Sequence, residues 1–542
     1  MAGTGKVSAC ALVASLLATT LFWALPAVAL GDEAEQIYDP GAMVEIDLEL
    51  SSQAETELEA EPDEDVAAKF TARLTDGTPG GTTTPLATDH PVEVHLKGHK
   101  GGSFRPLTEK AAFKLKFPKK DLFLGLRKMT LNNMVEDTSM IHETLAYGLF
   151  RAAGVPASRT GFAYLRVNGQ DYGVYLDLEN IDETFLANHY GTGNTLHLYE
   201  GEYGADADSP SIATLEAEVP EGVPKFEMDE GDPPATDLEA LATAVAGTSP
   251  SFSTRLAGLA DLDEMTRMWA VEKYISHWDG YSGEEAAKKP NNYYLHSDLG
   301  GLFQMLPWGT DNTWQVAQRI GFDGPAGLLF DGCLGDVACF RDYYGALKEL
   351  QGQATALDPD ALAASTAALL KPWQELEEDE STRGEHSVAE IKSDVAKVRR
   401  YIDERPDELA AWLAANEPPA EGSLTKGPPP IGVDPIGTRL PMDLRLVGVV
   451  KHPGQLRLRT RLKAPGRVRG WVSIQTKDGR RRVCAPDVST DTAGIVVLPC
   501  RFSDSVRQRL RRSGLWMRVA LRLTERDGDR ETTVRRVRVP RG

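Results

Sequence analysis

The net charge of this 542-residue chain reverses sign toward its C-terminal end, and this reversal sets the first limit on its architecture. Residues 423–542 contain 27 Lys and Arg against 10 Asp and Glu, whereas the rest of the chain holds 32 basic and 70 acidic residues. A segment rich in Pro and Gly, 417–436, lies at the boundary and is typical of a linker. We therefore expect two modules with different partners rather than one compact unit.

The N-terminus has the pattern of a secretory signal. Lys6 provides a positive start, an apolar run covers residues 11–25, and Ala27-Val28-Ala29 forms a small-x-small cleavage site. No later run is apolar enough to span a bilayer. The sequence therefore predicts a signal peptide over residues 1–29, cleavage after Ala29, and a mature protein that is secreted or held in the cell envelope.

Four cysteines follow the predicted signal peptide: Cys333, Cys339, Cys484 and Cys500. They form two pairs that are each close in the sequence. In an exported protein an even number of cysteines in local pairs predicts two short-loop disulfides, 333–339 and 484–500. A zinc site made by all four is the alternative, although the pairs lie far apart and lack Cys-x-x-Cys spacing.

A strand, a glycine-rich loop and a second strand are expected between residues 92 and 117. The second strand alternates lysines with buried-type residues, so the lysines share one face. A glycine loop lets backbone N–H groups approach phosphates, and a lysine on the next strand can neutralise them. The candidate phosphate contacts are Gly101, Gly102, Ser103, Lys110 and Lys114. A basic hairpin with a glycine turn would have the same pattern, and the loop matches no Walker motif.

A helix and a hairpin are expected next. Asp137 can cap a helix from about 139 to 153, in which Glu143 lies off the apolar stripe. Glu143 could pair with a strand lysine, or it could be an ordinary solvated glutamate. Asn168-Gly169 lies between two alternating runs and predicts a β-hairpin over 162–179.

Polar residues flank two apolar runs, 293–295 and 302–306, that are typical of a second hairpin. Asp279 and Asn291-Asn292 precede the first run, and Asp311 follows the second. One carboxylate could accept the proton of an attacking hydroxyl, while the amides and the other carboxylate could hold Mg²⁺ against nucleotide phosphates. A buried hairpin capped by turn-forming Asp and Asn is the alternative.

Several of these motifs, in this order, resemble the spore-coat-protein-H (CotH) type of atypical kinases. The matching stretches are Ser103-Phe104-Arg105 after a Lys-Gly loop, Leu131 to Tyr175, Leu198 to Gly204, Trp278-Asp279, Asn291 to Leu295, and Pro307 to Asp311. The resemblance covers about residues 38–314. It implies an α+β, atypical protein-kinase-like two-lobe fold over 30–416, with an N-lobe of about 38–180 and a C-lobe of about 181–416. It also implies transfer of the ATP γ-phosphate to protein Ser/Thr with Mg²⁺ or Mn²⁺.

The resemblance further implies a role for each candidate residue. Asp279 would be the catalytic base, and Asn291, Asn292 and Asp311 would bind the metal. Lys110 or Lys114 would contact the phosphates together with the loop Gly101-Gly102-Ser103. Glu143 would pair with the lysine, and Glu179 would lie near the adenine.

Two features depart from the family pattern. Gly309 stands where many relatives have Asp, and the charged run 284–289 lengthens the spacing between Asp279 and Asn291. ATP is also scarce outside cells. The alternative is a catalytically inactive kinase-fold protein with a structural or surface-binding role in the envelope or spore.

The basic C-terminal part, 437–542, contains short alternating runs separated by turns, which predict an all-β sandwich closed by the 484–500 bridge. Its arginines tend to occupy alternate positions and therefore line one face. That face could bind an anionic cell-wall polymer, phospholipid headgroups or the acidic part of the chain, or it could serve only solubility. Because the protein is expected to be exported, nucleic acid is a disfavoured ligand for this face.

Overall fold

The computed structural model describes residues 33–98, 102–201, 204–215, 223–283, 290–324, 326–378 and 382–418. Between residues 445 and 539 it describes eight strands and a few residues beside them. The predicted signal peptide, Gly101, the 284–289 run and most of the predicted linker lie outside the described residues.

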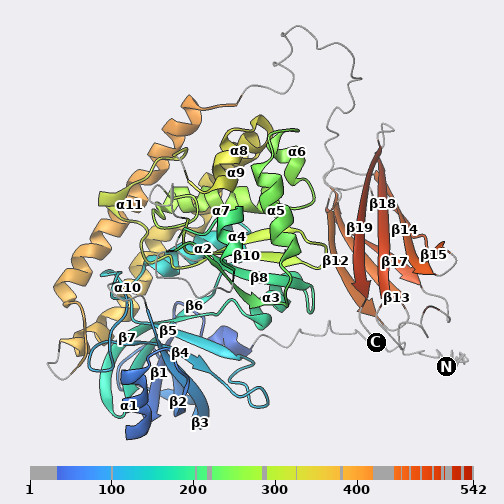
Figure 1. The fold of residues 1–542 in the computed structure, drawn as a ribbon. Coiled ribbons are helices and arrows are strands. Elements are labelled where there is room, and N and C mark those ends of the chain that lie inside the picture. The colour runs from blue at the N-terminus through green and yellow to red at the C-terminus, as the bar shows by residue number, and fades with distance from the viewer. Residues whose placement is uncertain are drawn as a thin grey trace, which may run out of the picture.

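Seven strands close into a barrel in the N-terminal part of the chain (Figure 1). The strands are β1 (Met43–Leu50), β2 (Val66–Thr75), β3 (Thr83–Lys97), β4 (Ala112–Lys116), β5 (Lys128–Asn132), β6 (Thr160–Val167) and β7 (Gln170–Leu178). Their order is β1-β2-β3-β4-β5-β7-β6, and β1 closes the ring by pairing parallel to β6. The alternating residues Phe113, Leu115 and Phe117 are fully buried in its core, as the sequence pattern predicts.

The hairpin predicted at Asn168-Gly169 is confirmed as β6–β7. Both turn residues have positive φ, 50° and 77°, as a two-residue turn between twisted strands requires. The helix expected from about 139 begins later, as α2 (His142–Ala152). Asp137 still satisfies its first turn, because Asp137 Oδ2 accepts the backbone N–H of His142 at 2.7 Å.

A second, four-stranded sheet lies among the helices, in the order β11-β10-β8-β9. Its strands are β8 (Thr195–Gly201), β9 (Phe226–Glu230), β10 (Tyr293–Asp298) and β11 (Phe303–Pro307). The hairpin predicted around residues 293–306 is confirmed as β10–β11. Thus a barrel and a helix-covered sheet together form a mixed α/β body.

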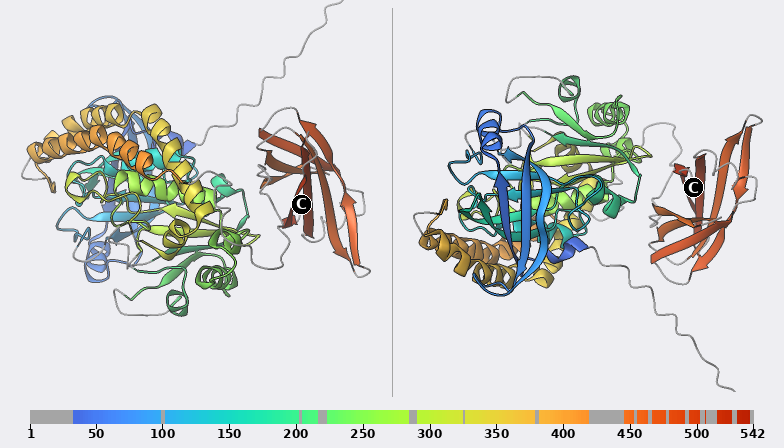
Figure 2. Two further views of the ribbon diagram at one scale, coloured as in Figure 1. Left: turned by 90° about the horizontal axis from the view of Figure 1, so that it is seen from above. Right: turned by 90° about the horizontal axis from the view of Figure 1, so that it is seen from below.

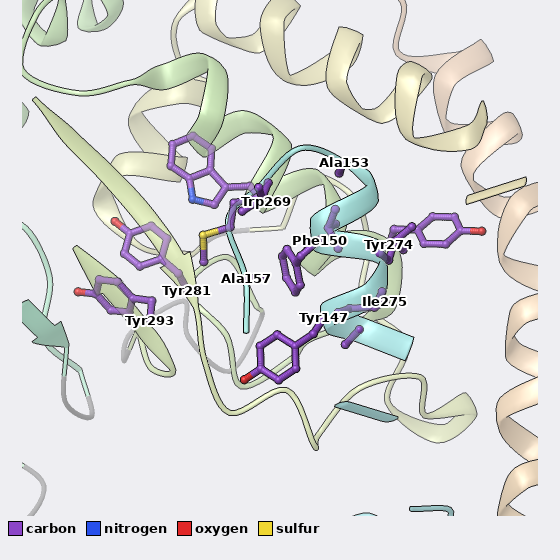
Figure 3. Packing of buried hydrophobic residues seen from close by; sticks show 14 of the residues in the cluster. Tyr147, Phe150, Ala153, Ala157, Trp269, Tyr274, Ile275, Tyr281 and Tyr293 are labelled. Atoms are coloured by element: carbon purple, nitrogen blue, oxygen red, sulfur yellow. The ribbon is translucent and has the colours of Figure 1, made fainter. Parts of the chain in front are cut away.

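The principal helices beside this sheet are α7 (Leu262–Ile275), α8 (Leu328–Leu334), α9 (Val337–Leu357), α10 (Pro359–Glu377) and α11 (Val388–Ala415). Tyr147 and Phe150 of α2 belong to the same buried cluster as Trp269 and Ile275 of α7 (Figure 3). The helix that follows barrel strand β5 is therefore packed into the core of the second part. Figure 2 shows α10 and α11 running along one side of the body, where α10 contacts β7.

The C-terminal strands form two sheets. One has the order β12 (Arg445–His452), β13 (Gln455–Leu462), β17 (Gly494–Arg501). The other contains β15 (Gly479–Cys484), β14 (Gly466–Thr476), β18 (Leu515–Glu525) and β19 (Arg530–Val539) in this order, with β16 (Asp487–Thr490) also paired to β14. Val468 and Val472 in one sheet and Leu498 in the other are fully buried. Alternating buried positions in two antiparallel sheets are typical of a sandwich.

Both predicted disulfides are confirmed. Cys333–Cys339 links α8 to α9 with a Cα–Cα distance of 5.0 Å, and Cys484–Cys500 links the two C-terminal sheets at 5.7 Å. The four-cysteine zinc site is wrong, because these bonds use all four sulfur atoms. Among the described helices, none combines the length and apolar character needed to cross a bilayer.

Candidate functional site

The loop after α7 is built around a buried carboxylate. Glu272 accepts the backbone N–H groups of Tyr281 at 3.0 Å and Ser282 at 2.9 Å. A Cβ at Gly280 would lie 2.6 Å from Glu272 Oε1, so only glycine allows this close approach. The result is a fixed loop that presents Asp279.

His277 ties this loop to the segment after β11. Its Nε2 lies 3.0 Å from the carbonyl oxygen of Gly309, and its Nδ1 lies 3.6 Å from Glu272 Oε1. Burial works against its charged form, but the hydrogen bond and charge of Glu272 outweigh burial and raise its pKa. The contact of Nε2 with Gly309 thus ties the loop that carries Asp279 to the segment that carries Asp311.

Both candidate asparagines contact Asp279. Asn292 Nδ2 donates to Asp279 Oδ2 at 2.9 Å and to its carbonyl oxygen at 3.1 Å, and Asn291 Nδ2 donates to Oδ2 at 3.3 Å. Burial raises the pKa of Asp279, and the charge of Asp311 adds to this, while His277 and the two amides oppose it. The sequence therefore predicted correctly that these polar residues meet.

Gly309 is explained by the same packing. Its φ is +50°, and a Cβ there would lie 2.4 Å from Asn292 Oδ1. An aspartate at this position would collide with the asparagine that holds Asp279. The glycine at position 309, which departs from the family pattern, is therefore the residue that fits beside Asn292.

Asp311 and Glu143 connect the site to α2. The carbonyl oxygen of Asp311 lies 2.6 Å from His142 Nδ1 in the first turn of the helix. The next residue, Glu143, is only 3% exposed and accepts a hydrogen bond from Asn132 Nδ2 at 2.6 Å. Burial raises its pKa to about 8, with a further contribution from the charge of Asp311. The solvated alternative for Glu143 is wrong.

The lysine that faces Glu143 is Lys97, at the end of β3, and the sequence analysis did not single it out. Burial lowers the pKa of Lys97, the charges of Glu143 and Asp311 oppose this, and Lys114 adds to it. Lys114 lies on β4 opposite His95, on the same face as Lys97. Both lysines line a cavity of about 210 Å³ together with Gly98, Glu200 and Trp308. The alternation of residue types along β3 could have identified Lys97, because it places this lysine on the face of the strand opposite to the buried one.

Lys110, the other candidate, lies elsewhere. Its Nζ is 3.2 Å from Glu377 Oε1, and both side chains are only 1% exposed. Glu377 also accepts the backbone N–H of Val174. The structure thus joins Lys110 to α10 and does not bring it to the cluster around Asp279.

The described part of the glycine loop is held at its base. Asn133 Nδ2 donates to the carbonyl oxygens of Ser103 at 3.0 Å and Lys110 at 2.8 Å. Gly98 has a φ of +119°, and a Cβ there would lie 2.7 Å from Phe104 N. Ser103 and Phe104 therefore fold back against Gly98, which lines the same cavity as Lys97.

The carboxylate of Glu179, the residue expected near the adenine, is bound by Arg159. Arg159 donates to it from Nη2 at 2.7 Å, from Nε at 3.0 Å and from its backbone N–H at 3.0 Å. Its carboxylate is therefore part of a fixed ion pair. A nucleotide base near this segment would have to use other groups.

A further carboxylate, Glu136, belongs to the site and had no signal in the sequence. Partial removal from water raises its pKa to about 7, and the charge and hydrogen bond of Asp311 add to this. The charge of Asp311 thus acts on Asp279, Glu136 and Glu143, and the charge of Asp279 acts on Glu136 as well. Carboxylate and amide oxygens are the ligands that Mg²⁺ and Mn²⁺ prefer, and a divalent cation would relieve the repulsion, so these residues suit such an ion.

Known proteins resemble this chain over much of its length. The profile of the CotH kinase protein family matches residues 98–409, more than half of the chain. The inner spore coat protein H of Bacillus subtilis is 26% identical over 222 residues, which are 40% of this chain and 58% of that protein. The invasin CotH2 of Rhizopus delemar is 27% identical over 228 residues, 38% of this chain and 37% of that protein. The match thus spans little more than half of the first relative and about a third of the second. This chain belongs to the CotH kinase protein family.

Proposed function

We propose that this protein is a kinase that transfers the γ-phosphate of ATP to Ser or Thr side chains of a protein, with Mg²⁺ or Mn²⁺. The observation that carries the proposal is the fixed position of Asp279. Two asparagine amides hold its carboxylate, and the charge of Asp311 acts on it from the end of the neighbouring hairpin. Phosphoryl transfer needs this combination of a positioned base and adjacent oxygen ligands.

In this proposal the body has the two lobes of an atypical kinase, about 38–180 and 181–416. The barrel side supplies Lys97, Lys114 and, through α2, Glu143. The sheet side supplies Asp279 after α7 and Asp311 after β11. Active sites between two parts of a chain are common because each part can present side chains from its own rigid elements.

Asp279 would accept the proton of the attacking hydroxyl. Its raised pKa makes the carboxylate a stronger base than an exposed aspartate. The hydrogen bonds from Asn291 and Asn292 keep the carboxylate in one orientation, so its reorganisation does not add to the barrier.

Lys97 and Lys114 would contact the phosphates in the cavity that they line. Glu143 would keep Lys97 in place once a bound divalent cation offsets the negative charge of the neighbouring carboxylates and of the phosphates. A bound Mg²⁺ or Mn²⁺ would neutralise charge on the phosphate oxygens, and Asp311 with the Oδ1 atoms of Asn291 or Asn292 would hold it.

The names of the relatives favour a location at the cell envelope or outside the cell. One is a spore coat protein and the other is an invasin. The expected signal peptide agrees with such a location. A catalytically inactive envelope protein with the same fold is the competing function, and it predicts no metal-dependent phosphate transfer.

The test is phosphate transfer from γ-labelled ATP by the mature chain, with Mg²⁺ or Mn²⁺, to itself and to an acidic acceptor protein. Asp279→Asn and Asp311→Asn should each lower the rate roughly 10²- to 10⁴-fold. Asp360→Asn is the matched control, because Asp360 pairs with Arg399 on the surface of the molecule. Equal rates in all variants, or no metal-dependent ATP binding by the parent chain, would overturn the proposal in favour of the inactive protein.

A further inference from the structure

A basic segment connects strands β4 and β5 at one end of the barrel, and it is called the basic tip below. It comprises residues 118–127, which contain Lys119, Lys120 and Arg127 against a single acidic residue, Asp121. The body of the molecule is otherwise strongly acidic, so this local excess of positive charge contrasts with its surroundings. Both lysines are exposed and Arg127 is half-buried, and none of the three belongs to an ion pair among the described residues.

The neighbouring carboxylates do not neutralise the basic tip. Asp65 and Glu93 lie 2.9 Å and 3.6 Å from the Nζ atom of Lys116, which ends β4 just before the tip. The carboxylate of Asp121 itself lies 3.5 Å from Nε2 of His90. The three basic residues of the tip therefore keep their charge available for a partner.

An exposed leucine lies among these cations. Leu122 is 42% exposed and is one of four exposed large apolar side chains in the part of the chain that the structure describes. Leu124 is half-buried and has a positive φ of 49°, followed by Gly125 with a φ of 80°. A positive φ is strained for a bulky side chain, and such strain is frequent in segments that make a functional contact.

The basic tip is fixed on the barrel by buried anchors. Phe123 and Leu126 are both buried, and the backbone N–H of Leu126 donates to the carbonyl oxygen of Phe123 at 2.8 Å. The ring of Phe123 lies edge-on to Phe70 at 4.8 Å between centroids, and 5.3 Å from Phe117. Leu122 is thus presented by a turn that is already ordered, so a partner would not have to order it on binding.

An exposed apolar side chain among cations suits the surface of an anionic membrane. Proteins bind such a surface by burying apolar side chains at the acyl boundary, while Lys and Arg are attracted to the anionic headgroups. We infer that the basic tip docks on an anionic phospholipid membrane. Leu122 inserts below the headgroups, and Lys119, Lys120 and Arg127 contact their phosphates.

Other partners suit the basic tip less well. A hydrophilic polyanion would use the cations but would gain nothing from the exposed Leu122. A protein partner would need a larger surface, because a standard interface takes roughly 20–30 residues from each side, and the tip spans only residues 118–127.

The basic tip lies away from the candidate kinase site. Strand β5 runs from Lys128, beside the tip, to Asn132, which donates to Glu143. Four steps along a strand span about 13 Å, so a membrane at the tip would leave that site free. The inference is independent of the proposed kinase activity, because it uses no residue of that site.

The experiment reads the environment of position 122 directly, because the basic C-terminal part could also attract anionic vesicles. The four cysteines of the mature chain form two disulfides, so Leu122→Cys supplies a single thiol for an environment-sensitive fluorophore. Vesicles of phosphatidylcholine with phosphatidylglycerol should shift its emission to the blue, and spin labels on the acyl chains should quench it. Vesicles of phosphatidylcholine alone should do neither. Leu376→Cys, at a position on α10 whose leucine is 39% exposed, is the matched control and should show no change.

Two double variants of equal charge test the lysines in the labelled chain. Lys119→Gln with Lys120→Gln should raise the lipid concentration at half-maximal shift roughly 10- to 25-fold, since each lysine near an anionic membrane contributes about fivefold. Lys348→Gln with Lys392→Gln removes the same charge from exposed positions on α9 and α11, and should change this concentration less than twofold. Equal effects of the two double variants would overturn the inference.

Three further outcomes decide the inference. A label at position 122 that stays in water while the chain binds anionic vesicles would overturn it, as would equal blue shifts on both kinds of vesicle. A larger shift with polygalacturonate, a soluble anionic polymer, than with vesicles would assign the tip to a polymer instead. Without any label, Leu122→Asn should weaken vesicle binding several-fold relative to Leu376→Asn. Equal affinities of these two variants would show that only the label inserts, and would also overturn the inference.

Discussion

Lys110 and Lys97 each interact with a buried glutamate, the first through a salt bridge with Glu377 and the second through its charge on Glu143. Lys110 and Glu377 are nearly inaccessible, and Glu377 Oε1 also accepts the backbone N–H of Val174, while Oε2 is buried without a hydrogen bond from the described residues. Lys97 lines a cavity, and the charges of Glu143, Lys114 and Asp311 all act on it. The first contact is balanced within itself and holds α10 to the barrel. The second lies among several carboxylates whose excess charge is relieved by protonation or by a bound cation, which is typical of a functional site.

The largest effect is expected when the salt bridge between Lys110 and Glu377 is removed. Lys110→Met should lower the free energy of unfolding by about 3–5 kcal/mol, because the carboxylate of Glu377 would stay buried without its cation. Urea denaturation at neutral pH measures this change. Lys371→Met, which breaks an exposed pair with Glu375 in the same helix as Glu377, should cost less than about 1 kcal/mol. Equal costs would show that the Lys110 contact does not hold the fold.

The opposite result is expected at the other lysine. Lys97→Met should lower kcat/KM for ATP about 100-fold, equivalent to about 2.7 kcal/mol, and change the stability little. The exposed Lys69 of β2 provides the control, since Lys69→Met removes the same charge far from the cavity. An unchanged kcat/KM for Lys97→Met would assign phosphate binding to Lys114 alone.

The excess charge should also appear as a pH dependence of stability. The pKa of Glu143 is raised to about 8 in the folded protein, so the folded state binds a proton that the unfolded state releases above about pH 4.5. The stability of the ligand-free protein should therefore fall as pH rises from about 5 to about 8, by roughly 2–4 kcal/mol.

Glu143→Gln should remove most of this slope, and thermal unfolding of both chains across the pH range tests it. A slope that survives in the variant would place the titrating group elsewhere, with Glu136 as the next candidate because its pKa is raised to about 7.

The smallest effect is expected from Gly309, which packs against Asn292 near Asp311. Gly309→Asp should cost about 1–3 kcal/mol of stability and lower the kinase rate, because the new side chain meets Asn292. Gly301→Asp is the matched control: its φ is also positive, at +76°, but nothing lies within 4 Å of its Cβ position. If both variants keep full activity, the contact between Gly309 and Asn292 does not position Asp279.

The sequence predicted those parts of the site that depend on local order. Alternation in β4, the Asn-Gly turn and the polar ends of the β10–β11 hairpin each reflect a rule that acts over a few residues. The partners of Lys110 and Glu179 could not be predicted in this way. Glu377 is 267 residues from Lys110, and Arg159 reaches Glu179 only because their strands are paired in the barrel. Which lysine is free to meet a phosphate is decided by such distant contacts.

The burial of α2 also determines how the molecule can move. This helix carries Glu143 but packs with α7 and α9 in the core of the second part (Figure 3). The same helix also contacts strand β6 of the barrel, so it is packed between the two parts and joined to both. The segment between β5 and α2 contains Met134 and Met140, both with positive φ, at 55° and 60°. A shift of either part would therefore act on α2, and through His142, which contacts the carbonyl oxygen of Asp311, on the end of the β10–β11 hairpin.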